Sequence, residues 1–203
     1  MKIIRTLLFL LALAIVAQYA AALVRDNQTL RNDLVRLHVV ANSDSEEDQA
    51  VKLQVRDAIV SMLEDTMANL PSAEEAKAYL QSHLRQIEDK ANEVLRQAGF
   101  TQTATVTLEQ EAFPTRDYDT FSLPAGIYNA LRVTIGNGEG HNWWCVLFPG
   151  LCVPASAEGV GEVAEVAGFP TGLGQALTRE NGNYTIRFRI LDWLGELQNK
   201  LFS

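Results

Sequence analysis

The sequence has few of the residues on which most metal and cofactor sites depend. Its 203 residues include only two cysteines and three histidines, His38, His83 and His141. The histidines lie far apart in the sequence and lack the spacing of paired zinc ligands. Neither a phosphate-binding loop nor a dinucleotide-binding fingerprint is present. We therefore predict no cofactor and no metal.

Basic residues are also scarce relative to acidic ones. Seventeen lysines and arginines stand against 25 aspartates and glutamates, which gives a net charge of −8. A protein this acidic is repelled by nucleic acid phosphates and by anionic lipid headgroups. With 47% hydrophobic residues and no internal repeat, the chain has enough apolar material for one core. We therefore predict a single domain without a nucleic acid partner.

The N-terminus has the pattern of an export segment. Lys2 and Arg5 provide positive charge, Leu7 to Ala17 is an apolar run, and Ala20 to Ala22 offer small residues for cleavage. Cleavage there would remove both cations and lower the net charge to −10. An uncleaved membrane anchor is the alternative, because the apolar character continues through Val24 and approaches the roughly 20 residues that span a bilayer. Either alternative places the rest of the chain outside the cytoplasm.

A strand followed by a polar junction and a helix is predicted between residues 36 and 58. The alternating run R-L-H-V-V places Leu37 and Val39 on one strand face, and Arg36, His38 and Val40 on the other. Small polar and acidic residues follow, and a charged helical pattern begins directly after them.

The polar junction favours a helix N-terminus. Ser45 with Asp48, or Asp44 with Glu47, has the three-residue spacing of a capping box, and acidic residues in the first turn suit the helix dipole. A calcium loop starting at Asn42 is excluded, because Glu47 stands where glycine is needed and Leu53 where the closing glutamate should be. Helix capping alone explains most of the acidity.

The remaining elements predict an α+β fold, with two long N-terminal helices on a mainly antiparallel sheet. The first helix should run from Glu46 to Met67, with Lys52 and Arg56 on its outer flank. Asp48 is four residues before Lys52, and Lys52 four before Arg56, so we expect these charges to interact along the helix. Its inner stripe should comprise Val51, Val55, Ala58, Ile59, Met62 and Leu63. Ser72 and Glu75 should cap a second helix that continues to Gln97 before Gly99.

Strands are predicted at 103–109, 127–135 and 143–148, and the last two should form a hairpin across the glycine-rich tract 136–140. The predicted divisions of the chain are a signal peptide or anchor at 1–24, an α+β signalling domain at 30–152, a Gly/Ala-rich loop at 153–183, and a C-terminal strand and short helix at 184–203.

Two tryptophans and two cysteines lie in or near the last of these strands. Neighbouring strand residues point to opposite faces, so only one of Trp143 and Trp144 can enter the core unless a second layer covers the other. An exposed indole would be a good anchor for a partner. Export favours a disulfide between Cys145 and Cys152, whereas a two-residue turn between them would hold them too far apart. The sequence therefore allows either a disulfide between Cys145 and Cys152 or two free thiols.

Two long segments, LHVVANSDSEEDQAVKLQVRDA and LPAGIYNALRVTIGNGEGHNWWCVLFPGLC, resemble the stage II sporulation protein R family of endospore-forming bacteria. The resemblance runs from about Leu34 to Cys152. One departure is Gly150, where the family typically has a second proline before the second cysteine. Members of this family are exported from the forespore into the septal intermembrane space. There they trigger a membrane aspartic protease of the mother cell to process pro-sigma-E, and no catalytic activity is attributed to them.

Enzymatic alternatives find little support in the residues. Cys145 lies four residues after His141, but its surroundings read as a buried strand. Ser43, His38 and Asp44 supply the residue types of a hydrolase triad without a G-x-S-x-G elbow. A secreted hydrolase therefore ranks below a non-enzymatic signal, and a membrane-anchored septal scaffold is the other alternative.

The predicted function is that of a secreted signalling protein that binds a membrane-embedded aspartic protease. The predicted contact residues combine the junction with the exposed member of the tryptophan pair: His38, Asn42, Ser43, Asp44, Asp48, Gln49, Lys52, Arg56, Trp143 and Trp144.

Overall fold

The computed structural model describes residues 2–117 and 122–149. The elements follow in the order α1 (Lys2–Asn32), β1 (Val35–Val40), α2 (Glu46–Asn69), α3 (Ala73–Gln97), β2 (Ala104–Phe113), β3 (Arg116–Asp117), β4 (Ser122–Leu123), β5 (Gly126–Ile135) and β6 (Asn142–Phe148). The predicted loop at 153–183, and the strand and helix after it, lie outside the described residues.

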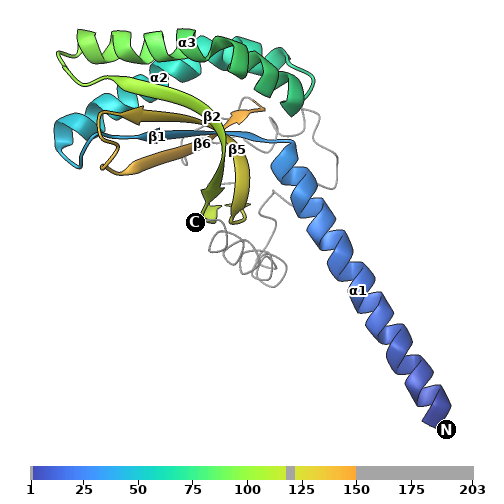
Figure 1. The fold of residues 1–203 in the computed structure, drawn as a ribbon. Helices are drawn as coiled ribbons and strands as arrows, with labels where there is room; N and C mark the ends of the chain where they lie inside the picture. Colours follow the sequence, from blue (N-terminus) through green and yellow to red (C-terminus); the bar gives the residue numbers. More distant parts are fainter. Residues whose placement is uncertain (1, 118–121, 150–203) are drawn as a thin grey trace.

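Four strands form the main sheet, in the order β2-β5-β1-β6. β1 pairs with β5 in parallel and with β6 antiparallel, and β2 pairs with β5 antiparallel. Helices α2 and α3 lie together against one face of this sheet (Figure 1). The predicted α+β class with a mainly antiparallel sheet is confirmed.

The predicted hairpin between the strands at 127–135 and 143–148 is wrong, because β1 lies between β5 and β6. The glycine-rich tract instead crosses the end of β1, where the Gly140 N–H donates to Ala41 O (2.9 Å) and the Glu139 N–H donates to Asn42 O (3.2 Å). All six residues of β1 are buried. A strand covered on both faces is best placed inside a sheet, since its main chain is then paired along both edges.

Both long helices begin where their capping residues predict; α3 ends at Gln97 as predicted, whereas α2 continues two residues beyond the predicted Met67, to Asn69. The Ser45 side chain accepts from the Asp48 N–H at the start of α2, and Ser72 accepts from the Glu75 N–H at the start of α3. Gly99, just beyond α3, has φ +81°, a conformation that glycine adopts without steric penalty.

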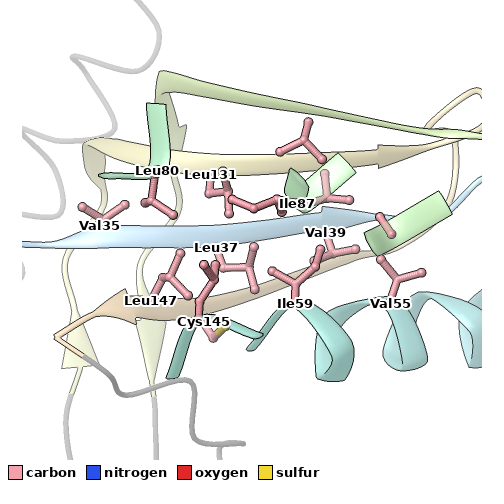
Figure 2. Close-up of a cluster of buried hydrophobic side chains, with 14 of the residues drawn as sticks. Val35, Leu37, Val39, Val55, Ile59, Leu80, Ile87, Leu131, Cys145 and Leu147 are labelled. Atoms are coloured by element: carbon pink, nitrogen blue, oxygen red, sulfur yellow. The ribbon is translucent and has the colours of Figure 1, made fainter. Parts of the chain in front are cut away.

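The main core lies between the sheet and the two helices (Figure 2). Leu37 and Val39 of β1 point into it, as predicted. The buried stripe of α2 follows four-residue steps and comprises Val51, Val55, Ile59, Leu63 and Met67. Met62, predicted to be inside, is 37% exposed because it lies at the margin of this stripe. Ala58 is half-buried.

Helix α1 extends away from the sheet, and among residues 2–117 and 122–149 it contacts the domain through its C-terminal end (Figure 1). There Arg31 Nη2 donates to Ala125 O at 2.9 Å. Large apolar side chains along α1 are exposed, for example Ile3 at 75% and Phe9 at 68%. Within the described part of the chain, no helix combines the length and the apolarity needed to cross a membrane. Whether residues 1–24 are cleaved or retained stays a prediction.

Candidate functional site at the strand-to-helix junction

The junction between β1 and α2 is held together by Asp48. Its Oδ2 accepts from Asn42 Nδ2 at 2.9 Å and from Ser43 Oγ at 2.5 Å, while its N–H donates to Ser45 Oγ at 3.1 Å. The hydroxyl of Ser43 and then the amide of Asn42 lower the pKa of Asp48, because both donate to its ionised carboxylate. Asp48 is buried, so its carboxylate bonds to groups inside the protein.

The glycine-rich tract is fitted closely against this junction. Asn42 Oδ1 accepts from the Asn137 N–H at 3.1 Å. A Cβ built on Gly136 would come within 2.2 Å of the same oxygen, and one built on Gly140 within 2.2 Å of Ser43 O. The two long segments that carry the family resemblance therefore pack directly against each other, and Gly136 and Gly140 provide the room for that contact.

Lys52 ties α2 to the end of the same tract. Its Nζ donates to Gln49 Oε1 at 2.6 Å and to His141 O at 2.9 Å. Burial lowers the pKa of Lys52, and the nearby charge of Asp44 opposes this effect. The predicted position on an outer flank is wrong, because His141, the residue directly after the tract, lies against this part of α2, and Lys52 is only 4% exposed. Lys52 bonds to neither Asp48 nor Arg56 within the described residues.

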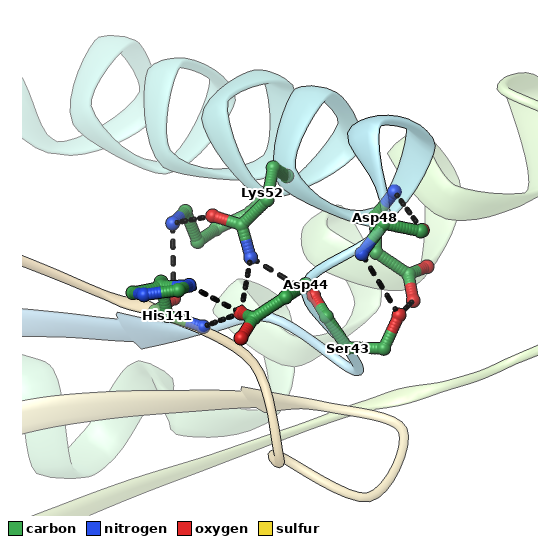
Figure 3. Close-up of polar contacts among 7 residues, drawn as sticks. Ser43, Asp44, Asp48, Lys52 and His141 are labelled. Carbon is green, nitrogen blue, oxygen red and sulfur yellow. Dashed lines mark hydrogen bonds and ion pairs between the residues drawn. The ribbon is translucent and has the colours of Figure 1, made fainter.

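Asp44 and His141 form the exposed rim of the junction (Figure 3). Asp44 Oδ1 accepts from the His141 N–H at 2.6 Å, contacts His141 Nδ1, and accepts from Gln49 Nε2 at 3.4 Å. The Asp44 side chain is 56% exposed and that of His141 is 77% exposed. These two side chains are accessible at the junction, as are the exposed residues Ser45, Glu46 and Glu47 beside them. His141 was not among the predicted contact residues, because only the crossing of the tract over β1 brings it here.

A second polar cluster lies on the sheet face opposite α2 and α3. His38 Nδ1 bonds to Glu111 Oε1 and Oε2 at 2.8 and 2.9 Å, and His38 Nε2 bonds to Asn142 Oδ1 at 2.8 Å. Arg132 Nη1 donates to Glu111 Oε1 at 2.9 Å. The side chains of His38 and Glu111 are 6% and 15% exposed. Sequence reasoning missed Glu111, because the strand was predicted to end at Glu109.

The two adjacent tryptophans point to opposite faces of β6, as predicted. Trp143 lies beside Val39 and packs against the main core, whereas Trp144 lies beside His38 and stacks on its ring. Each indole is covered by an arginine, Arg56 at 4.1 Å over Trp143 and Arg116 at 3.8 Å over Trp144. Both tryptophans are half-buried, so neither is the fully exposed indole that the alternation allowed.

The ten predicted contact residues therefore divide by location. The junction network unites Asn42, Ser43, Asp44, Asp48, Gln49 and Lys52, whereas His38 and Trp144 lie on the opposite sheet face, and Arg56 and Trp143 beside α2. His38, Asp48 and Lys52 are buried, so their side chains bond to groups inside the protein. Partner binding by the accessible residues stays a prediction.

The residue types of the enzymatic alternatives are not assembled within the described residues. Ser43 Oγ donates to Asp48, while His38 is engaged by Glu111 and Asn142. No group of three or more histidine, cysteine, aspartate or glutamate side chains is placed to hold a metal ion there. Cys145 is disulfide-bonded. Its predicted partner, Cys152, lies outside the described residues, so that pairing stays a prediction.

Comparison of the sequence with known proteins identifies the family of this chain. The family model described as stage II sporulation protein R (spore_II_R) matches residues 31–158. This chain belongs to the stage II sporulation protein R family. Stage II sporulation protein R of Bacillus subtilis (strain 168) is 39% identical over 143 residues, which is 70% of this chain and 64% of that protein. No solved structure matches the chain.

Family membership supports a role in sporulation. The aligned part is slightly less than two thirds of the Bacillus subtilis protein. The junction and the His38 cluster both fall within residues 31–158. The two clusters are therefore features of the region that defines the family.

Proposed function

We propose that this chain is an exported sporulation signal, released from the forespore into the septal intermembrane space, that activates a membrane-bound aspartic protease. Processing of pro-sigma-E in the mother cell is the proposed outcome. The observation that carries the proposal is the 39% identity to a stage II sporulation protein R over 143 residues. The acidic composition supports it, because a net charge of −8 disfavours a nucleic acid partner.

Activation by contact requires that the signal bind the active arrangement of the protease more tightly than the inactive one. The junction suits this task because its polar groups already bond to one another, as Asp48 does with Asn42 and Ser43. A surface that is ordered before binding loses less conformational entropy when the complex forms. The proposed mechanism makes and breaks no covalent bond.

The exposed rim formed by Asp44 and His141 is the proposed contact surface. Both side chains are more than half exposed. They bond to each other, and Asp44 also accepts from Gln49 Nε2 at 3.4 Å. Gln49 lies beside them and donates to Ser43 O at 2.9 Å. The rim therefore presents a carboxylate and an imidazole in a fixed arrangement.

Cleavage of pro-sigma-E in membranes that carry the protease tests this function. Purified protein is added to such membranes, and cleavage is followed with the wild type, Asp44→Asn, and Asp65→Asn as a control. Asp65 is an exposed aspartate on α2, away from the rim. We expect cleavage with the wild type and with Asp65→Asn, and strongly reduced cleavage with Asp44→Asn. Absence of cleavage with the wild type would refute the proposed function.

A further inference from the structure

Strand β2 forms one edge of the sheet, and side chains of α3 cover its first half. The Ala104 N–H donates to Asn92 Oδ1 at 2.8 Å, and Asn92 Nδ2 donates to Ala104 O at 3.1 Å. The Val106 N–H donates to Glu88 Oε2 at 3.0 Å. These bonds satisfy three of the main-chain groups that point away from the sheet at this end of the strand: the N–H and O of Ala104 and the N–H of Val106.

The second half of β2 lacks such cover. β2 pairs with β5 in one continuous register from Ala104 to Phe113, so main-chain groups of alternate residues point to the same side. The main-chain groups of Ala104 and Val106 point away from β5, so those of Leu108, Gln110 and Ala112 point the same way. Within residues 2–117 and 122–149, no side chain bonds to the outward main-chain groups of these three, and Gln110 and Ala112 are exposed.

The two sides of this open edge differ in chemistry. Leu108 packs against the main core and offers an apolar contact on the helix side of the sheet. Glu109 lies on the other side with its side chain 45% exposed, and its carboxylate is 3.9 Å from Arg132 Nη1. A strand laid along this edge would need apolar residues on the side of Leu108 and basic residues on the side of Glu109.

We propose that residues 108–112 of β2 bind an extended segment of a partner protein by strand addition, with alternating apolar and basic side chains. Main-chain hydrogen bonds to the edge provide affinity in this binding mode, and the alternate side chains provide specificity. This inference is independent of the protease assignment, because it specifies the partner's chemistry and not its identity.

Two other occupants are outcomes that the exchange experiment below distinguishes from the proposed partner. A second copy paired antiparallel about Gln110 would place Glu109 opposite Glu111, and like charges directly opposite are destabilising. Residues 184–190 of the chain itself alternate in a similar way, with Arg187 and Arg189 on one side. They lie beyond residues 31–158, whereas the open edge lies within that family region.

Amide hydrogen exchange of the full-length free protein tests whether the edge is open. We expect fast exchange at Leu108, Gln110 and Ala112, and slow exchange at Glu109 and Glu111, which face β5. Slow exchange at all five positions in the monomer would show that the chain's own residues occupy the edge. Slow exchange only at high protein concentration would show a second copy. Either result would overturn the proposal.

Binding of a seven-residue peptide that alternates valine and lysine tests the chemistry of the occupant. We expect the peptide to slow exchange at Leu108, Gln110 and Ala112, and a peptide alternating valine and glutamate to bind more weakly. Gln110→Pro should reduce affinity at least about tenfold, because proline removes an outward N–H without breaking a bond to β5. Gln110→Thr is the matched control and should bind as the wild type does. Equal affinity of the proline and threonine variants would overturn strand addition at this edge.

Discussion

The two faces of strand β1 are both buried but are packed in different ways. Leu37 and Val39 meet apolar side chains of α2 and α3, whereas His38, between them in sequence, meets Glu111, Asn142 and the ring of Trp144. Apolar packing is non-directional and tolerates exchange between similar side chains. Hydrogen-bonded polar contacts require particular partners at particular positions. Exchanges between similar side chains should therefore be tolerated least on the polar face of β1 and at the junction where β1 ends, because particular side chains are required there.

The largest effect is expected on the apolar face. Leu37→Ala should lower the free energy of unfolding by about 2–5 kcal/mol, because Leu37 is fully buried and its removal leaves a cavity. Urea denaturation measures this loss, with Leu53→Ala as the control, since Leu53 is 36% exposed on α2. Equal losses in the two variants would contradict the assignment of the main core.

A smaller loss is expected on the polar face. Glu111→Gln removes the charge that faces both His38 and Arg132, and should lower the free energy of unfolding by about 1–3 kcal/mol. Glu109→Gln is the control, because Glu109 lies 3.9 Å from Arg132 and is much more exposed. If both variants unfold at the same urea concentration, the bonds of Glu111 to His38 and Arg132 do not stabilise the fold.

At the junction, the contribution of Asp48 should depend on pH. Its folded-state pKa lies below the ordinary value of 3.8, so the stability it provides is present above pH 3.8 and is lost as the pH falls through the folded value. Asp48→Asn should therefore cost about 1–2 kcal/mol near neutral pH, and less in acid. Thermal unfolding of both proteins across this range measures the difference. A gap in Tm that stays constant into strong acid would contradict the role of the ionised carboxylate.

The smallest effect on stability is expected at the exposed rim. Asp44→Asn should change the free energy of unfolding by no more than about 0.5 kcal/mol, because its contacts are solvent-exposed. Protease activation should nevertheless fall strongly in the proposed function. Asn42→Ala should instead lower both stability and activation, because Asn42 joins Asp48 to the glycine-rich tract. Matching stability losses in the two variants would place Asp44 among the internal residues of the junction.

Local features of the fold could be predicted from the sequence. Alternation identified β1 and its inward residues, and serine with an acidic residue three positions later identified the start of both α2 and α3. These features depend on neighbouring residues and on the repeat of the element itself. The strand-to-helix junction was therefore placed correctly.

Long-range features could not be predicted in this way. The glycine-rich tract between β5 and β6 was compatible with a hairpin, and only the pairing of β1 with both strands turns it into a crossing. That crossing brings His141 to the rim and buries Lys52. Glu111 was missed because the two residues directly after Glu109, Gln110 and Glu111, are polar and interrupt the alternation, and because its partner His38 is 73 residues away in sequence. Each of these errors concerns a contact that is distant in sequence, whereas the error at Met62 concerns the margin of a helical stripe.

Processing of pro-sigma-E by protease-bearing membranes, with purified protein as the only addition, tests the central claim most directly. The account predicts that cleavage requires both the membrane protease and this protein, and that Asp44→Asn reduces it while Asp65→Asn does not. Cleavage of the substrate by the purified protein without the membranes would contradict a signal that acts by contact alone.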